Sequence, residues 1–260
     1  MKKRHLLTLF ALASFTTLLS PITSVAAPAN NAEMQKTIRE YIMKNPEVIV
    51  QSLQEYQQKQ MSDTQKSFKK VQEAAPKYAD KLFRSPTDPV AGNPKGTITI
   101  VEFSDYQCSH CTTMSPVLSK IIKQNPNVRV VLKEFPIRGP MSETAARAAL
   151  AAQKQGKYYD FRVALMENQK GKLTEEFIMS QAKKLGLNVK KLKTDMDSKA
   201  VKDQLKQNQE LAQKLKIMYT PVFFVAKTDI KTNAKPDEVA FIPGGIDGDR
   251  LNSIIKGIGS

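Results

Sequence analysis

Two cysteines, Cys108 and Cys111, are the only thiols in the 260 residues, and just two residues, Ser109 and His110, separate them. A structural disulfide gains most when it closes a long loop, and this spacing closes almost none. The pair is better suited to thiol–disulfide exchange, in which one thiolate attacks a disulfide and the second thiol resolves the mixed disulfide. A positively charged His110 would further favour the thiolate.

The residues around the pair predict a strand followed by a helix. Residues 97–103 are mostly β-branched, and residues 108–126 repeat apolar side chains at helical spacing. Cys108 would then lie at the helix N-terminus, where unpaired backbone N–H groups lower the pKa of a thiol below its free value of about 8.5. Cys111 would follow almost one turn later, on the same side of the helix.

The rest of the chain predicts an α/β arrangement. Residues 128–136 read as a second strand, which gives a strand–helix–strand unit with parallel strands and a right-handed crossover. The stretch from about 140 to 216 reads as helical throughout. Residues 220–226 and 239–245 then predict a hairpin, and a short helix over 247–258 follows.

The N-terminus has the pattern of a signal peptide. A basic start precedes an apolar run over residues 6–19, which is too short for a membrane span, and small residues follow it. We expect cleavage after Ala26, so that residues 1–26 are removed. A retained membrane anchor is the alternative interpretation.

Residues 27–83 predict a helical segment with an apolar stripe but few large apolar side chains. Such a segment is a poor candidate for folding alone. Its stripe must pack either on its own globular domain or on a second chain, and we favour a second copy, which makes a homodimer. Residues 84–96 are dense in Pro and Gly and predict a linker.

The formal net charge of +15 raises the question of an anionic partner. The lysines are scattered over predicted helices, without a basic stripe interleaved with aromatic residues, so we expect no nucleic-acid partner. Cys108, His110 and Cys111 could together offer three metal ligands. Structural zinc takes four, and the other histidine, His5, lies in the signal segment. We therefore expect no dedicated metal site and no cofactor.

The motif F-x-D-Y-x-C-x-H-C at 103–111, the strand–helix–strand entry, the helical insertion and a Thr-Pro pair at 220–221 resemble the DsbA-type branch of the thioredoxin superfamily. The resemblance covers about residues 90–260. The N-terminal segment is similar to the extension of DsbA-like exported proteins that dimerise, a layout shared with the DsbC and DsbG isomerases. The resemblance implies a thioredoxin-like fold over 97–260 with an inserted helical domain at about 140–216, plus an N-terminal helical extension.

The resemblance also implies roles for site residues. Cys108 matches the exposed nucleophile of the family and Cys111 the buried resolving thiol. Pro221 matches a cis-proline that faces the disulfide, and Thr220 before it would offer backbone hydrogen bonds to an extended substrate. Separately from the resemblance, we expect Met218 and Tyr219 to flank the substrate groove.

Glu102 matches the buried acid of the family, which exchanges a proton with the resolving thiol. Lys133 on the next strand is its expected partner. Ser109 stands where strongly oxidising members commonly carry Pro, and Thr220 precedes the cis-proline more often in isomerase-like or thioredoxin-like members. These two departures leave the choice between oxidase and isomerase open.

We therefore expect an exported, periplasmic thiol:disulfide oxidoreductase acting on thiol-containing exported proteins. An oxidase would pass its electrons to a membrane partner of the DsbB kind, and an isomerase would be kept reduced by one of the DsbD kind. The alternative hypothesis is an exported chaperone or scaffold whose thiols are secondary.

Overall fold

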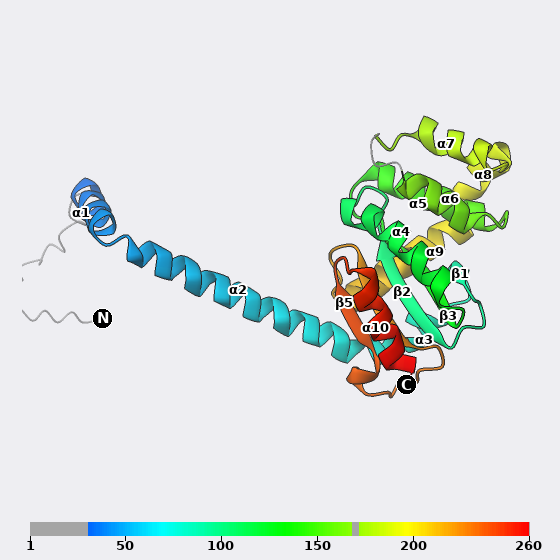
Figure 1. The fold of residues 1–260 in the computed structure, drawn as a ribbon. Coiled ribbons are helices and arrows are strands. Elements are labelled where there is room, and N and C mark those ends of the chain that lie inside the picture. The colour runs from blue at the N-terminus through cyan, green and yellow to red at the C-terminus, as the bar shows by residue number, and fades with distance from the viewer. Residues whose placement is uncertain (1–30, 168–171, 260) are drawn as a thin grey trace, which may run out of the picture. The chain divides into compact units, whose positions relative to one another are not determined.

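A computed structural model describes residues 31–167 and 172–259 (Figure 1). The expected signal peptide, residues 1–26, lies outside them. The chain divides into two units, with the boundary between Lys59 and Gln60, and each unit is described by itself.

The β-branched and aromatic stretches of the second unit form a five-stranded mixed sheet in the order β1-β3-β2-β4-β5. Its strands are β1 (Val90–Gly92), β2 (Ile98–Ser104), β3 (Val128–Glu134), β4 (Val222–Lys227) and β5 (Ala240–Pro243). β2 and β3 run parallel, and the other three pairs are antiparallel. The predicted parallel pair and the predicted hairpin are confirmed.

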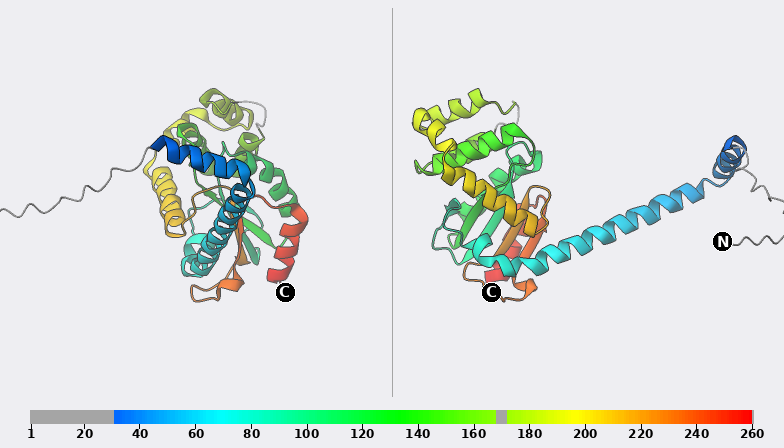
Figure 2. Two further views of the ribbon diagram at one scale, coloured as in Figure 1. Left: turned by 90° about the vertical axis from the view of Figure 1, so that its left-hand side faces the viewer. Right: turned by 180° about the vertical axis from the view of Figure 1, so that it is seen from behind.

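Helices pack on both faces and beyond one end of this sheet (Figure 2). They are α3 (Ala79–Phe83), α4 (Ser109–Gln124), α5 (Pro140–Gln153), α6 (Tyr158–Met166), α7 (Glu175–Lys184), α8 (Val189–Met196), α9 (Lys199–Lys214) and α10 (Gly248–Gly259). The run α5 to α9 lies between β3 and β4 in the chain, which confirms the predicted helical insertion. Within the described ranges, no helix is both long enough and apolar enough to cross a membrane.

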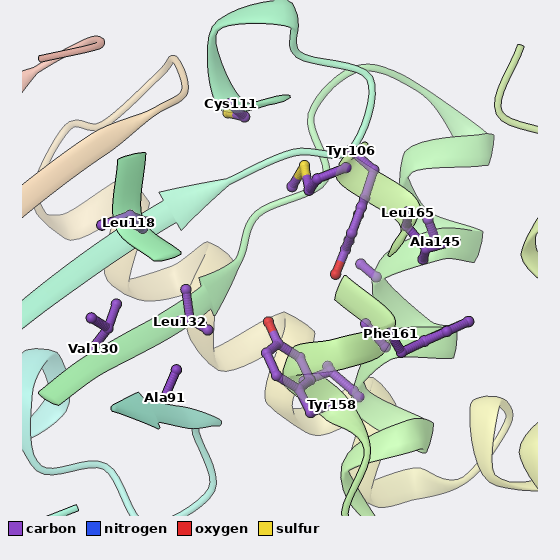
Figure 3. Close-up of a cluster of buried hydrophobic side chains, with 14 of the residues drawn as sticks. Ala91, Tyr106, Cys111, Leu118, Val130, Leu132, Ala145, Tyr158, Phe161 and Leu165 are labelled. Carbon is purple, nitrogen blue, oxygen red and sulfur yellow. The ribbon is translucent and has the colours of Figure 1, made fainter. Parts of the chain in front are cut away.

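The sheet separates two apolar cores. Successive residues of a strand point to opposite faces, so on β2 and β3 the even-numbered residues, such as Ile100 and Val130, join the core that contains both cysteines (Figure 3). The odd-numbered residues of these two strands, such as Val101 and Val131, join the second core, beneath α3 and the end of α9. This alternation decides which side chains can reach the cysteines.

The expected linker over 84–96 contains part of the sheet. β1 pairs antiparallel with β3, and Leu132 donates a backbone hydrogen bond to the Pro89 carbonyl at 3.0 Å. Asp88 is buried as well. The linker prediction is therefore wrong at its centre, because a three-residue strand among Pro and Gly is too short to give a periodic pattern.

The second unit also begins earlier than expected. α2 (Glu47–Ala74) continues past the boundary into a 3₁₀ turn over Ala75–Tyr78 and then into α3. Val71, Leu82 and Phe83 are buried in the second core. The end of the segment expected over 27–83 therefore folds with the sheet rather than apart from it.

The first unit consists of α1 (Asn31–Lys44) and the start of α2. The predicted break between two helices at Asn45 and Pro46 is confirmed. α1 has no buried residue. The large apolar side chains of this unit that remain exposed are Met34, Ile38, Tyr41, Met43, Val48, Ile49, Val50, Leu53 and Tyr56.

Candidate functional site

Cys108 is the N-cap residue of α4, with extended backbone angles of φ −88° and ψ 113°. The Thr112 amide donates to its carbonyl at 3.0 Å, which closes the first turn. Cys111 lies in that turn. The sequence prediction that the pair sits at a helix N-terminus is confirmed, and the free N–H groups of this turn favour an anionic sulfur.

Both cysteines are free thiols and both are fully buried. The expectation of an exposed Cys108 is wrong for this conformation. The Thr220 carbonyl lies 3.2 Å from the Cys108 sulfur, which donates a hydrogen bond to it when protonated.

The two thiols differ in proton affinity. A hydrogen bond from Cys111 lowers the pKa of Cys108 to about 5, aided by the positive charge of Arg138 and opposed by burial. Burial raises the pKa of Cys111 above its ordinary value, and the Cys108 sulfur and the Glu102 carboxylate raise it further. At neutral pH the reduced pair therefore carries a thiolate at Cys108 and a thiol at Cys111.

The peptide bond between Thr220 and Pro221 is cis, as the resemblance implied. The Pro221 carbonyl accepts a hydrogen bond from the Gly244 amide at 2.9 Å, which ties the segment to the end of β5. Next to this segment, Met218 is 81% exposed and Tyr219 37% exposed. The structure thus brings Thr220 and Cys108 together, with two exposed apolar residues directly before Thr220 in the chain.

Glu102 is fully buried in β2, on the face of the sheet that carries the cysteines. Burial raises the pKa of its carboxyl. Its partner is Arg162 of α6, whose Nη2 lies 2.5 Å from Glu102 Oε2. Both side chains have no exposed surface.

Lys133 is not the partner of Glu102. The register aligns Glu102 with Leu132. Lys133 is the next residue of β3, so its side chain points to the opposite face of the sheet. There it forms a buried ion pair with Asp88 and donates to the Lys81 carbonyl at 2.5 Å. The prediction fails because it considered the neighbouring strand but not the strand's alternation.

Ser109 and His110 are exposed at the start of α4. The Ser109 carbonyl accepts hydrogen bonds from Thr112 Oγ1 at 2.7 Å and Thr113 Oγ1 at 3.0 Å. The effect of Ser109 and His110 on the redox chemistry stays a prediction.

Three groups escaped the sequence reasoning. Arg138 acts on Cys108, and Arg162 comes from the helical insertion 60 residues after Glu102. Asp105 is a buried carboxylate within the motif itself. Asp105 could have been found, because a buried acid directly after a buried strand needs hydrogen-bond donors.

The aspartate connects two turns of the site. Its Oδ2 accepts hydrogen bonds from the Ile137 and Arg138 amides at 2.7 and 2.9 Å. Its Oδ1 accepts from the Gln107 amide and from Ser142 Oγ, both at 2.7 Å. The carboxylate therefore holds the segment that carries Arg138 against the turn that carries Cys108.

Comparison with known proteins gives related folds. A thioredoxin-like oxidoreductase from Silicibacter pomeroyi is 39% identical, with 68% of this chain and 95% of that one covered and a TM-score of 0.61. BcfH from Salmonella enterica Typhimurium is 31% identical, with coverage of 88% and 95% and a TM-score of 0.66. The catalytic domain of Proteus mirabilis ScsC is 26% identical, with coverage of 72% and 97% and a TM-score of 0.60.

Among curated proteins, the chain matches a Na⁺/H⁺ antiporter NhaA of Salinispora arenicola, at 26% identity over 54% of this chain, but spans only 22% of that protein's length. It matches a probable disulfide bond formation protein D of Bacillus cereus at 28% identity, over 56% of this chain and 73% of the relative.

Two family models match this chain, each over a different range of residues. Residues 31–61 match the N-terminal domain of the copper resistance protein ScsC. Residues 99–256, which include the two cysteines, Glu102 and the cis Thr-Pro pair, match the DSBA-like thioredoxin domain. The chain belongs to the DsbA-like family of thiol:disulfide oxidoreductases.

Proposed function

We propose that this chain is an exported, periplasmic enzyme that forms and isomerises disulfides in exported proteins through Cys108 and Cys111. The observation that carries the proposal is the arrangement of the two thiols: Cys108 is the N-cap residue of α4, Cys111 lies in the same turn, and the carbonyl before the cis Pro221 lies against the Cys108 sulfur. The pKa of about 5 at Cys108 and the raised pKa at Cys111 agree with it. Thiolates attack disulfides, and thiols of low pKa also leave readily. Cys108 therefore suits both the attacking and the leaving role.

In the oxidase direction, a substrate thiolate attacks the sulfur of Cys108 in the protein's disulfide. Cys111 leaves as a thiolate and takes a proton, which we assign to Glu102. A second substrate thiolate then attacks the substrate sulfur of the mixed disulfide and releases Cys108 as a thiolate. The substrate loses two electrons, and the Cys108–Cys111 pair gains them.

In the isomerase direction, the Cys108 thiolate attacks a wrong disulfide, and a thiolate of the substrate later displaces it. Thr220 would bind the backbone of an extended substrate beside Cys108, and Ser109 and His110 would tune the sulfur. The exchange partner would be of the DsbB kind for an oxidase and of the DsbD kind for an isomerase.

We further propose that the first unit joins two copies of the chain. Its exposed apolar side chains support this proposal, because residues such as Ile38 and Leu53 have no covering partner within their own described unit.

The test of the function follows disulfide formation in a reduced, unfolded protein with several cysteines, and repair of a scrambled one. We expect the full chain to catalyse both reactions and Cys108→Ser to abolish them. Thiol trapping in cells then reports the working state: an oxidised pool supports the oxidase, a reduced pool the isomerase, and a mixture both.

A chaperone or scaffold is the competing function, because the same exposed apolar side chains could hold unfolded clients. It would be supported if Cys108→Ser kept all activity while removal of residues 27–59, which leaves the second unit whole, abolished it. The opposite pattern supports the enzyme.

A further inference from the structure

A second buried carboxyl, Glu134, lies beside the acid that we assign to Cys111. It is the last residue of β3 and is aligned with Ser104 of β2, two residues after Glu102. Glu102, Ser104 and Glu134 therefore share one face of the sheet. The exposed fraction of Glu134 is 1% and that of Glu102 is 0%.

Two tyrosines hold one oxygen of Glu134. Tyr106, from the turn before α4, donates to Oε1 at 2.7 Å, and Tyr158 of α6 donates to the same oxygen at 2.5 Å. Figure 3 shows the two hydroxyls pointing into the same region from opposite sides. Glu134 is thus built into the site by three elements, although nothing in the mechanism above uses it.

Arg162 acts on both carboxyls. Its Nη2 contacts Glu102 at 2.5 Å and Ser104 Oγ at 3.4 Å, and its charge also acts on Glu134. The other titratable groups that act on the carboxyls are Cys108, Cys111, Tyr106 and Tyr158. Tyr159 also feels both Glu102 and Arg162, and its hydroxyl pairs with Ser119.

The cluster of Glu102, Glu134 and Arg162 carries a net charge of one negative unit when both acids are ionised. Across the described residues it contains two carboxyls and one guanidinium, all fully buried or nearly so. A net buried charge is costly, so the cluster is neutral when it holds one proton. Oε1 of Glu102 and Oε2 of Glu134 accept no hydrogen bond from any described residue, which leaves an oxygen free on each acid for that proton.

We propose that Glu134 is a positioning residue that shares one exchangeable proton with Glu102 across Arg162, and that this shared proton is the one given to Cys111. The proposal rests on the proposed function, in which Glu102 exchanges a proton with Cys111. When a substrate thiolate opens the disulfide, Cys111 leaves as a thiolate and takes the shared proton. The cluster becomes singly negative and regains a proton from solvent. Electrons move only between sulfurs.

The burial that raises the pKa of Glu134 to about 7 agrees with a proton held near neutrality. The measurable consequence is that the ionisation of Glu102 depends on the charge of Glu134. With Glu134 replaced by Gln, Glu102 and Arg162 form a neutral pair without any proton, so Glu102 should ionise at lower pH.

The test follows the carboxyl carbon of Glu102 by NMR across a pH titration, in oxidised full-length protein in which neither sulfur titrates. We expect Glu134→Gln to lower the midpoint of Glu102 by at least about one pH unit, a tenfold change in proton affinity. Tyr158→Phe removes a donor to the Glu134 carboxylate and raises the pKa of Glu134, so the shared proton stays on Glu134 more of the time and the Glu102 midpoint should also fall, by less. Glu143→Gln, an exposed change on α5, is the control that should leave it unchanged.

Kinetics distinguish a proton donor from a structural support. At pH 7, Glu134→Gln should slow the opening of the disulfide by a small thiol about tenfold or more, because the cluster no longer holds a proton to give. Closure of the reduced pair by oxidised glutathione should not slow, because Glu102 can still accept a proton. The difference from wild type should vanish at a pH where the wild-type cluster is also deprotonated.

An unchanged Glu102 midpoint in Glu134→Gln overturns the proposal, as does equal slowing in both directions at every pH. If Glu134→Gln does not fold, Tyr158→Phe decides alone: a lowered Glu102 midpoint supports sharing and an unchanged one refutes it. Failure of the proposed function looks different, because wild-type protein would then exchange no disulfide at Cys108 at all.

Discussion

At the scale of single residues, the site is governed by what surrounds each sulfur. Cys108 is stabilised as a thiolate by Cys111 and by the charge of Arg138. Cys111 is buried next to Glu102, which opposes its ionisation. The histidine between the thiols is the residue that the sequence draws attention to, but the cation that acts on Cys108 in the structure comes from a turn 30 residues later.

Arg138 should therefore contribute to the reactivity of Cys108, beside the larger effect of Cys111. We expect alkylation of the reduced protein by iodoacetamide to show a thiolate with a midpoint near pH 5, and Arg138→Gln to raise that midpoint. Arg250→Gln, on the exposed side of α10, is a matched control. An Arg138→Gln profile that overlays wild type would remove Arg138 from the account.

The same ionisation should appear as a pH-dependent stability of the reduced protein. The pKa of Cys108 falls from its ordinary value, about 8.5 in a free thiol, to about 5 in the folded state. The stabilisation is thus fully present above about pH 9 and is lost as the pH falls towards 5. Urea unfolding of reduced wild type and reduced Cys108→Ser across this range should diverge as the pH rises, and parallel curves would contradict the low pKa.

Lys133 gives a test of the corrected pairing. Lys133→Met leaves Asp88 buried without its cation, which typically costs about 3–5 kcal/mol of stability. We expect the loss in urea unfolding, with most of it recovered when Asp88 is also replaced by Ala. The pH profile of disulfide exchange should not move, because Lys133 lies on the face away from the cysteines. A moved profile would instead favour the pairing with Glu102.

At the scale of elements, Asp105 joins two turns that are far apart in the chain. The turn before α4 carries Cys108, and the turn before α5 carries Arg138. Four hydrogen bonds to one buried carboxylate fix their relative position. Hydrogen bonds to charged groups contribute about 1.5–3 kcal/mol each, and they are not additive.

Asp105→Ala should therefore cost at least about 3 kcal/mol of stability and also raise the pKa of Cys108, because Arg138 loses its anchor. The two effects are measured by urea unfolding and by the alkylation profile. Ser142→Ala removes only one of the four donors and is the graded control. Asp105→Ala with an unshifted Cys108 would show that the carboxylate supports the fold but not the charge arrangement.

Periodicity and turn chemistry were enough to predict most elements of the second unit. β2, α4 and β3 follow from the apolar spacing, and the Cys108 position follows from the strand-to-helix turn. β1 could not be predicted, because its three residues have no pattern of their own and are stabilised only by pairing with β3. The partner of Glu102 required the packing of a helix from the insertion, which no local pattern specifies. That Lys133 faces away was within reach of the sequence, since parallel register and alternation together exclude it.

At the scale of the whole molecule, the two units differ in how they bury apolar surface. The second unit has two closed cores on either side of its sheet. The first unit exposes apolar side chains along α1 and the start of α2. Exposed apolar patches of this kind mark interaction surfaces. Pairing of two copies through the first unit would place two active sites in one particle, an arrangement suited to rearranging disulfides.

Removing apolar side chains from the first unit should therefore separate assembly from chemistry. We expect the mature chain to sediment as a dimer and Ile38→Asp with Leu53→Asp to sediment as a monomer. Gln54→Asp changes an exposed polar residue of α2, the helix that carries Leu53, and is the matched control. The monomer should keep the alkylation midpoint of Cys108, because that site lies wholly within the second unit, but should lose repair of scrambled disulfides relative to simple oxidation. A wild type that sediments as a single chain contradicts the assembly, a larger particle contradicts the count of two, and an unchanged repair rate in the monomer contradicts the link between assembly and isomerisation.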